Sequence, residues 1–132
     1  MTPAPTLATV ADSYLQAWNL RDVDAILALH AESSTFQVHG RTPQVQGIDA
    51  LRTAFTEVFD RYSNFHAEVH RLLLGPSHWV LDWTLTFTPD GEAAAGFRCL
   101  DVVEVSADGL VTRKDTFYDD PQARAALSGA VS

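Results

Sequence analysis

The hydrophobic pattern of this chain changes part-way along it, from a helical repeat to alternation. Apolar side chains recur every three or four residues after Thr6, Asp22 and Gly47, which predicts three helices. After Ser63 the pattern is broken by turn signals into four predicted strands, over residues 64–74, 78–88, 95–106 and 109–119. Helices followed by a run of antiparallel strands are typical of the α+β class, in which the helices cover one face of a sheet.

A further short strand is predicted between the second and third helices. Residues 35–39 alternate polar and apolar side chains, and Gly40 ends this strand before a polar loop over 41–46. His30 falls at the end of the second predicted helix, on its apolar side. We expect it to be a histidine of the core or of a pocket rim.

The composition indicates one folded domain. A chain of 132 residues, 46% of them apolar, fits a single domain over 1–132, with its core over about 6–120. Three Trp, three Tyr and seven Phe are too many for a disordered chain. The sequence contains no run of ~20 apolar residues for a membrane span and no secretory signal pattern at its start. The expected location is therefore the cytoplasm.

The charge and the cysteine content exclude several classes of partner. Nine Lys and Arg against seventeen Asp and Glu give a net charge of −8, which repels nucleic acids and anionic membranes. Cys99 is the single cysteine, so it has no internal disulfide partner. Because no cluster of His and Cys has metal-ligand spacing, neither a metal nor another cofactor is expected.

Successive side chains of a strand point to opposite faces, so odd and even positions separate the two faces of the central strands. One acid then stands on an apolar face. In 78–88 one face carries apolar side chains throughout, and Asp82 lies on the other, more polar face. In 95–106 one face carries Phe97, Cys99 and Val103, and Asp101 stands in the middle of them. Asp101 is therefore a carboxylic acid on an apolar face, in mid-strand.

A carboxylate in such a place is costly to ionise unless a donor or a cation faces it. Acids of this kind are candidates for general acid/base catalysis. For an isolated Asp the more frequent alternative is a structural one, in which Asp101 only accepts hydrogen bonds inside the core. Tyr14, on the apolar stripe of the first helix, is a natural donor to Asp101, and its own alternative is an ordinary core tyrosine.

Short segments along nearly the whole chain carry a family resemblance. They are residues 13–19 (SYLQAWN), 21–29 (RDVDAILAL), 47–51 (GIDAL), 69–73 (VHRLL), 100–105 (LDVVEV), 108–111 (DGLV) and 115–119 (DTFYD). In these segments the chain resembles the nuclear transport factor 2-like superfamily, and within it the SnoaL-like polyketide cyclases and the ketosteroid isomerases.

The resemblance implies a fold and a class of chemistry. The family fold is a curved, mostly antiparallel sheet wrapped against three helices as a cone-shaped barrel, with an apolar pocket inside and commonly a homodimer. The implied activity is acid/base chemistry beside a carbonyl of a small apolar molecule, such as isomerisation or cyclisation. The alternative is a non-catalytic member that binds a hydrophobic ligand or serves in dimerisation.

The resemblance also implies roles for particular residues. Tyr14 falls where ketosteroid isomerases carry the tyrosine of their oxyanion hole, and Asp101 where they carry the aspartic acid that completes it. In SnoaL-like cyclases an Asp at the Asp101 position moves the proton. Val38 occupies the position of the isomerase base and cannot take a proton. His39 is the remaining catalytic candidate, although alternation points it to the opposite face unless a bulge or the strand end turns it inward.

The expected pocket combines aromatic walls with the only lysine of the chain. Its expected lining is Trp18, Phe36, Val38, Phe55, Phe59, Trp83, Phe97, Val103, Lys114 and Tyr118. A lysine close to Asp101 would keep that acid ionised, whereas burial alone would favour its neutral form. The sequence leaves both environments open.

The second face of the sheet indicates self-association. Leu100 and Val102 lie on that face of strand 95–106, and residues 72–74 of another strand are all leucine. Because the helices cover only one face, we expect a homodimer formed through the outer face of the sheet.

Overall fold

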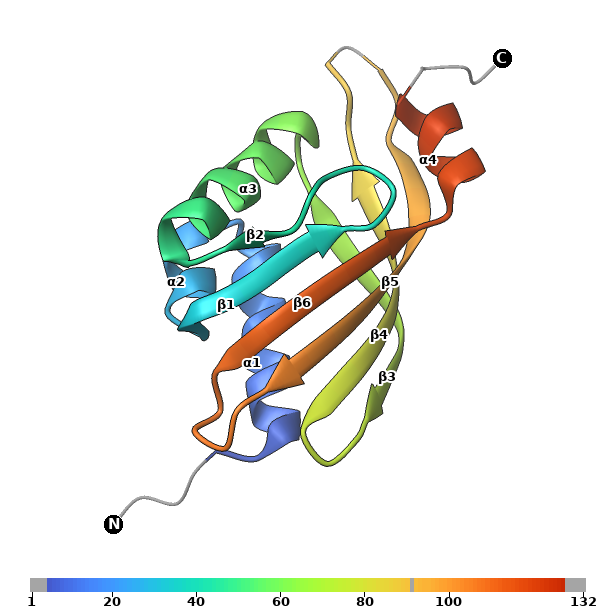
Figure 1. Cartoon of the computed structure of the whole chain (residues 1–132). Coiled ribbons are helices and arrows are strands. Elements are labelled where there is room, and N and C mark those ends of the chain that lie inside the picture. The colour runs from blue at the N-terminus through green and yellow to red at the C-terminus, as the bar shows by residue number, and fades with distance from the viewer. Residues whose placement is uncertain (1–4, 91, 128–132) are drawn as a thin grey trace.

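The structure is a computed structural model that describes residues 5–90 and 92–127. Gly91, in the predicted turn at 89–91, lies outside the described residues, as do both ends of the predicted 1–132 domain. Four helices and a curved, open six-stranded sheet make up the described part (Figure 1). The α+β class is confirmed, with one helix more than the three that the sequence predicts.

Three helices precede most of the sheet: α1 (Leu7–Asn19), α2 (Val23–Leu27) and α3 (Ile48–Arg61). The Thr6 hydroxyl caps α1 by accepting the Thr9 N–H at 3.2 Å, and the Asp22 carboxylate caps α2 by accepting the Ala25 N–H at 3.1 Å. Gly47 begins α3 with φ of 93°, a conformation that favours glycine. The predicted starts of all three helices are confirmed.

The second helix is shorter than predicted, because strand pairing takes over the end of the segment. The Leu29 carbonyl accepts the Val111 N–H at 2.8 Å, and His30 pairs with Val111. His30 therefore begins a strand instead of ending a helix, and that strand starts five residues before the predicted 35–39.

The strands are β1 (His30–Val38), β2 (Val45–Gln46), β3 (His66–Leu74), β4 (His78–Phe87), β5 (Ala95–Val105) and β6 (Val111–Tyr118). They form one sheet in the order β2-β1-β6-β5-β4-β3. The β1–β6 pair is parallel and the other four pairs are antiparallel, so the sheet is mostly antiparallel, as expected. The two-residue β2 lies in the segment that the sequence predicts as a loop.

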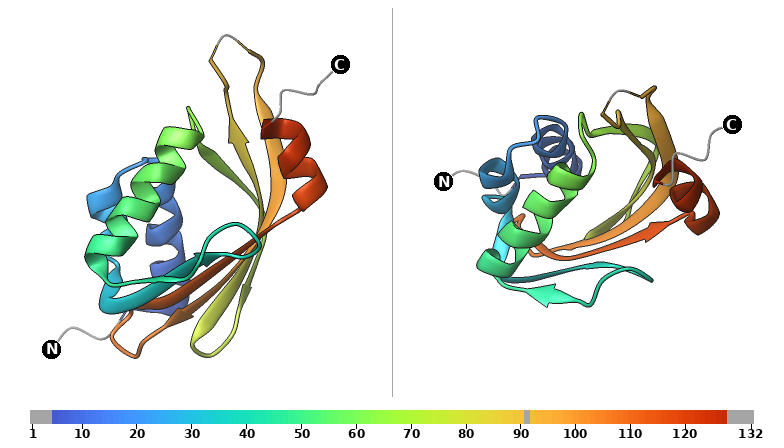
Figure 2. Two further views of the ribbon diagram at one scale, coloured as in Figure 1. Left: turned by 45° about the horizontal axis from the view of Figure 1, so that its top comes forward. Right: turned by 90° about the horizontal axis from the view of Figure 1, so that it is seen from above.

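The sheet curves around α1, α2 and α3, which cover its concave face (Figure 2). The fourth helix, α4 (Asp120–Leu127), lies beside β5, apart from the other three helices (Figures 1 and 2). Two small residues of this helix, Ala123 and Ala126, are buried, and the Arg98 backbone N–H donates to the Gln122 side-chain oxygen at 2.9 Å. Small buried residues give only a weak hydrophobic signal, so this helix was not predicted.

The core lies between the three helices and the concave face. The inward faces of β4 and β5 are those that parity predicts, with Trp83 and Phe97 buried and Arg98 and Glu104 exposed. Asp101 is buried on the inward face of β5. No helix in the described residues is long and apolar enough to cross a membrane.

Candidate functional site

The strand register brings two ionisable side chains together on the concave face. Asp101 of β5 pairs with Thr116 of β6, and Lys114 stands two residues before Thr116 on the same face of β6. Lys114 in turn pairs with Phe36 of β1. An acid and a base are therefore placed next to each other in the interior of the cone.

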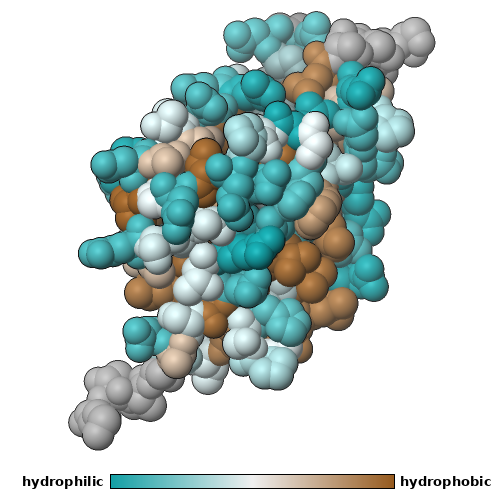
Figure 3. All heavy atoms as spheres, in the orientation of Figure 1, coloured by the Kyte–Doolittle hydropathy of each residue, from teal (hydrophilic) through white to brown (hydrophobic). Residues whose placement is uncertain are grey.

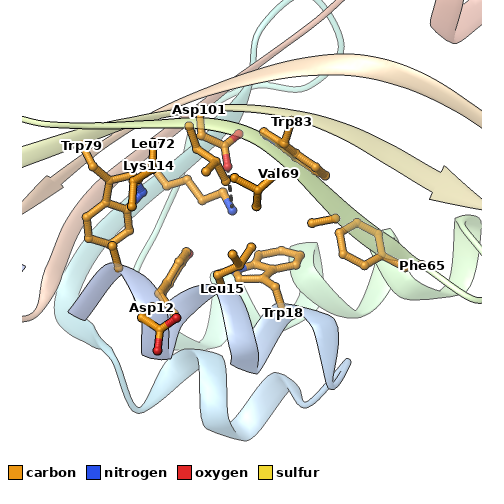
Figure 4. Close-up of a pocket in the computed structure, with 14 residues that line it drawn as sticks. Asp12, Leu15, Trp18, Phe65, Val69, Leu72, Trp79, Trp83, Asp101 and Lys114 are labelled. Atoms are coloured by element: carbon orange, nitrogen blue, oxygen red, sulfur yellow. Dashed lines mark ion pairs between the residues drawn. The ribbon is translucent and has the colours of Figure 1, made fainter. Parts of the chain in front are cut away.

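Asp101 is only 3% exposed and both of its oxygens have partners. The Thr116 hydroxyl donates to Oδ1 at 2.8 Å, and Lys114 Nζ lies 3.5 Å from Oδ2, as the dashed line in Figure 4 marks. Of the two environments that the sequence leaves open for Asp101, the structure shows the one with a cation beside it. A buried carboxylate paired in this way can exchange a proton with its neighbour without contact with bulk water.

Lys114 is as deeply buried as its partner. Its side chain is 5% exposed, and Nζ lies 3.9 Å from the centre of the Trp18 ring and 5.1 Å from that of Tyr14. The aromatic faces stabilise a positive charge, whereas burial disfavours one. Burial has the larger effect and lowers the pKa of Lys114, although the charge of Asp101 acts in the opposite direction.

A cavity of about 90 Å³ lies over this pair (Figure 4). It is enclosed by α1 on one side and by β3, β4, β5 and β6 on the other, with a lining of Ala11, Asp12, Tyr14, Leu15, Trp18, Phe65, Ala67, Val69, Leu72, Trp79, Leu81, Trp83, Asp101 and Lys114. Val69 and Leu72 of the edge strand β3 are 39% and 40% exposed. The cavity therefore opens toward solvent beside β3.

Two buried hydrogen-bond donors in the wall have no acceptor. The indole N–H groups of Trp18 and Trp83 find no hydrogen-bond partner in the part of the chain that the structure describes. Both residues line the cavity. A buried N–H group without an acceptor is unfavourable by about 1–3 kcal/mol. An oxygen of a bound molecule would satisfy this need.

Tyr14 makes a different hydrogen bond from the expected one. Its hydroxyl lies 2.8 Å from His30 Nε2, and His30 Nδ1 lies 3.0 Å from the Ser34 hydroxyl. Burial lowers the pKa of His30 to about 3, so its ring is neutral and donates one of these two hydrogen bonds while accepting the other. Burial also raises the pKa of Tyr14 above its usual range. Tyr14 thus lines the cavity, but its hydroxyl belongs to a chain of groups that leads away from Asp101.

The other predicted lining residues are divided between a second cavity and the core. Phe36, Val38 and Tyr118 line a separate cavity of about 230 Å³ under α3, which also holds Arg41 and Arg61. A void of about 10 Å³ shares residues with both cavities, among them Trp18, Phe36 and Lys114. The four remaining predicted residues, Phe55, Phe59, Phe97 and Val103, are not among the lining residues of these cavities and pack in or against the core.

His39 lies on the opposite face of the sheet from Asp101. Its Nε2 is 2.7 Å from Asp115 Oδ1, and its ring stacks on Phe117 at a centroid distance of 4.3 Å. The register with β6 is regular from Thr35 to Val38, so no bulge next to His39 turns it inward. The structure therefore does not bring the third catalytic candidate to the cavity.

In the described residues, neither a reactive thiolate nor a metal site accompanies the pair. Burial raises the pKa of the Cys99 thiol above its usual range, so Cys99 is not a thiolate at neutral pH. Within the described ranges, no group of three His, Cys, Asp or Glu side chains is placed to hold a metal ion.

Most of the chain matches a known family. A family model described as a SnoaL-like domain matches residues 11–114. The chain belongs to the SnoaL-like domain family. Among curated protein sequences none matches it. The matched residues contain most of α1, all of α2 and α3, β1 to β5 and the first half of β6, and they include both members of the Asp101–Lys114 pair.

Solved structures share the SnoaL-like fold at low sequence identity. A putative SnoaL-like polyketide cyclase from Shewanella denitrificans is 11% identical, with a TM-score of 0.79 over 95% of this chain and 98% of that one. An epoxide hydrolase/cyclase-like enzyme with a role in pyran ring formation in the polyether salinomycin is 18% identical, with a TM-score of 0.78 over 88% and 92%. A hypothetical protein with a ketosteroid isomerase-like fold from Catenulispora acidiphila, in complex with trimethylamine, is 13% identical, with a TM-score of 0.79 over 95% and 94%. At these identities the likeness establishes the fold.

Two features of this SnoaL-like site were missed by sequence reasoning. The bond from Tyr14 to His30 depends on where β1 begins, and the sequence places His30 in a helix instead. The alternation of Ser34, Phe36 and Val38 does not continue to His30, because Glu32 is exposed and the register with β6 shifts between His30 and Thr35, so the sequence gives no clear signal for the longer strand. The lack of an acceptor for the two indoles has no counterpart in the sequence, because it depends on the positions of every neighbouring side chain.

Proposed function

We propose that this SnoaL-like protein is an acid/base enzyme that moves a proton beside the carbonyl group of a small apolar molecule. The observation that carries the proposal is the buried Asp101–Lys114 pair at the wall of an apolar cavity. Asp101 is the group that takes and returns the proton. The reaction class is isomerisation, cyclisation or a related proton transfer.

The proton-transfer role of Asp101 rests on its surroundings. Removal of a proton next to a carbonyl creates negative charge on the carbonyl oxygen, and this charge must be stabilised as it forms. Thr116 holds one oxygen of Asp101, and Lys114 faces the other. The carboxylate is thus fixed in one orientation, with a cation available to compensate the charge.

Residues with hydrogen-bond donors surround the place that a substrate oxygen would occupy. Lys114, Trp18 and Trp83 line the same cavity as Asp101, and the indole N–H groups of the two tryptophans have no hydrogen-bond partner in the described residues. Donors that are already in place and shielded from water stabilise a developing oxyanion better than water does. The aromatic walls and the volume of about 90 Å³ favour a small, apolar ring or short chain around that oxygen.

The test uses deuterium exchange into a simple probe. Cyclopentanone in D₂O exchanges its α-hydrogens when a base removes them, and NMR follows the exchange. We expect the protein to accelerate this exchange, and Asp101→Asn to reduce the acceleration by roughly 10²–10⁴-fold, the usual contribution of a general base. Asp60→Asn, on the exposed side of α3, is the matched control and should leave the rate unchanged.

Full exchange activity in Asp101→Asn would contradict the proposal. A second result would favour the alternative, a non-catalytic member that binds a hydrophobic ligand. That result is saturable binding of cyclopentanone, seen by quenching of tryptophan fluorescence, with no acceleration of exchange over the buffer.

We also propose that the protein forms a homodimer through the outer face of the sheet. Leu73, Leu100 and Phe117 are exposed there, and Figure 3 shows apolar side chains gathered over β5, β4 and β3. Two acids on this face are paired in place: Asp82 with Arg71 and Arg98, and Asp115 with Arg113 and His39. This pairing reduces the repulsion that a net charge of −8 would otherwise create between two copies of the chain.

A further inference from the structure

Lys114 has properties that a simple charge partner for Asp101 does not need. It is the only lysine among 132 residues, while the chain carries eight arginines, and it is buried in the interior instead of lying on the surface. An arginine could pair with a carboxylate at least as well, since its guanidinium is the better partner for a buried ion pair. What a lysine offers and an arginine does not is an amine that can lose its proton and act as a nucleophile.

We propose that Lys114 is a nucleophile that forms an imine with the carbonyl carbon of an aldehyde or ketone in the cavity over Asp101. This inference rests on the proposed function, because it concerns the same cavity and the same carbonyl group. It adds a covalent step and names the substrate class as small, unhindered aldehydes and ketones. Lys114 then acts on the carbonyl directly, and Asp101 moves the protons.

The amine can reach its reactive, neutral form inside the protein. Burial disfavours the ammonium form and lowers the pKa of Lys114. Asp101 Oδ2, 3.5 Å from Nζ, is placed to receive the proton that the ammonium loses. Transfer within the pair replaces two buried charges by two neutral groups, so no charge has to leave the interior. Figure 4 shows Lys114 Nζ directed toward Asp101 at the wall of the cavity.

The atoms and protons balance in the following steps. The neutral amine of Lys114 attacks the carbonyl carbon, a C–N bond forms, and the carbonyl oxygen takes the proton that Asp101 received. The nitrogen then gives a proton to the Asp101 carboxylate, which passes it to the hydroxyl group of the adduct. The C–O bond breaks, water leaves, and the nitrogen lone pair completes a C=N bond as a protonated imine. The net reaction joins an ammonium and a carbonyl compound into an iminium ion and water.

The surroundings of Lys114 suit this product. An iminium ion keeps the positive charge at the place where the ammonium held it, 3.9 Å from the Trp18 ring centre and beside Asp101. Cation–π attraction and the ion pair therefore persist after the bond has formed. A proton next to an iminium carbon is more acidic than one next to a ketone, so the same Asp101 can remove it more readily.

Reductive trapping tests the inference in the wild-type protein. Cyclopentanone with sodium cyanoborohydride at pH 7 converts an imine into a stable secondary amine, and peptide mapping by mass spectrometry locates the added cyclopentyl group. A reference ε-amine is supplied by Arg124→Lys on α4, where the native side chain is 78% exposed. An ordinary lysine is almost fully protonated at pH 7. We expect Lys114 to be labelled roughly tenfold or more faster than the reference amine, with a rate that saturates as cyclopentanone is raised.

Asp101→Asn and Lys114→Arg give the second readout. Asp101→Asn keeps the shape of the side chain but cannot relay protons, so labelling of Lys114 should slow by at least tenfold. Lys114→Arg keeps a cation beside Asp101 and removes the nucleophile, so the accelerated deuterium exchange should be lost. Circular dichroism establishes that each variant is folded, and the labelling of the wild-type protein does not depend on either variant.

The outcomes separate this inference from the proposed function. If Lys114 is labelled only after unfolding in urea, and Lys114→Arg still exchanges deuterium, imine formation is wrong and proton transfer by Asp101 stands. If Lys114 is labelled with saturation but the wild-type protein does not accelerate exchange, imine formation stands and the proposed proton transfer fails. If neither labelling nor exchange occurs in the folded protein, both are wrong.

Discussion

His30 is a histidine that the fold keeps neutral. It is 5% exposed, with Tyr14 on one ring nitrogen and Ser34 on the other, and its pKa is lowered to about 3 by burial and by the charge of Lys114. The unfolded chain binds a proton at this residue below about pH 6.5, and the folded protein does not. The contribution of His30 to the free energy of unfolding is therefore fully present above pH 6.5 and is lost as the pH falls toward 3.

The pH dependence of unfolding tests this description of His30. Between pH 7 and pH 4.5 the wild-type protein should lose roughly 2–3 kcal/mol more free energy of unfolding than His30→Gln, as urea titrations would measure. His66→Gln, an exposed histidine on β3, is the matched control and should follow the wild type. The same loss in His30→Gln as in the wild type would show that His30 is protonated in the folded state.

Residues differ in how far the sequence predicts their roles. Asp101 was placed correctly, because β5 alternates apolar and polar residues clearly enough to fix its faces. Lys114 was expected in the pocket lining, but the sequence left open whether it meets Asp101, because neither face of β6 is apolar: Lys114 and Thr116 face inward while Phe117 faces outward. Its position follows from the pairing with Val103 and Phe36, which is a property of the whole sheet.

At the scale of the elements, α3 packs against α1 and β1. Leu51 and Phe55 of this helix are fully buried, and the Phe55 ring packs against those of Trp18, His30 and Phe36. These contacts join α3 to α1 and to β1. The helix therefore contributes both to the core and to the position of the aromatic wall around Lys114.

Removing one side chain from this helix should be costly. Leu51→Ala leaves a cavity in a fully packed region, and we expect it to lower the free energy of unfolding by about 2–5 kcal/mol in urea titrations. Thr56→Ala, on the exposed side of the same helix, serves as the comparison and should change it by less than about 0.5 kcal/mol. Equal effects of the two substitutions would mean that α3 does not pack as described.

Boundaries between elements were the least predictable feature of the fold. Local pattern places the start of each helix, because the capping side chains lie in the sequence next to it. It does not place the end of α2. There His30 pairs with Val111, which lies 81 positions further along the chain, and this strand pairing overrides the helical repeat. The family resemblance predicts the cone shape. It does not predict the hydrogen bond between Tyr14 and His30, which depends on His30 beginning β1 instead of ending α2.

At the scale of the whole molecule, the sheet has one covered face and one open face. The helices α1, α2 and α3 cover the concave face, and α4 lies only beside β5 (Figure 2). Exposed apolar side chains remain on the outer face, where Leu73 is 53% exposed. Soluble proteins seldom leave such an area unpaired. The proposed homodimer would cover it.

Light scattering on two charged variants tests the dimer. At micromolar concentration the wild-type protein should have the mass of two chains, and Leu73→Asp should have the mass of one, because a two-fold axis brings the new charge on one copy close to that on the other. Leu20→Asp introduces the same charge at a leucine that is 72% exposed after α1, outside the sheet, and should leave the dimer intact. A wild-type mass of one chain would refute the dimer. A dimer that persists in Leu73→Asp and dissociates in Leu20→Asp would place the interface at the helices instead.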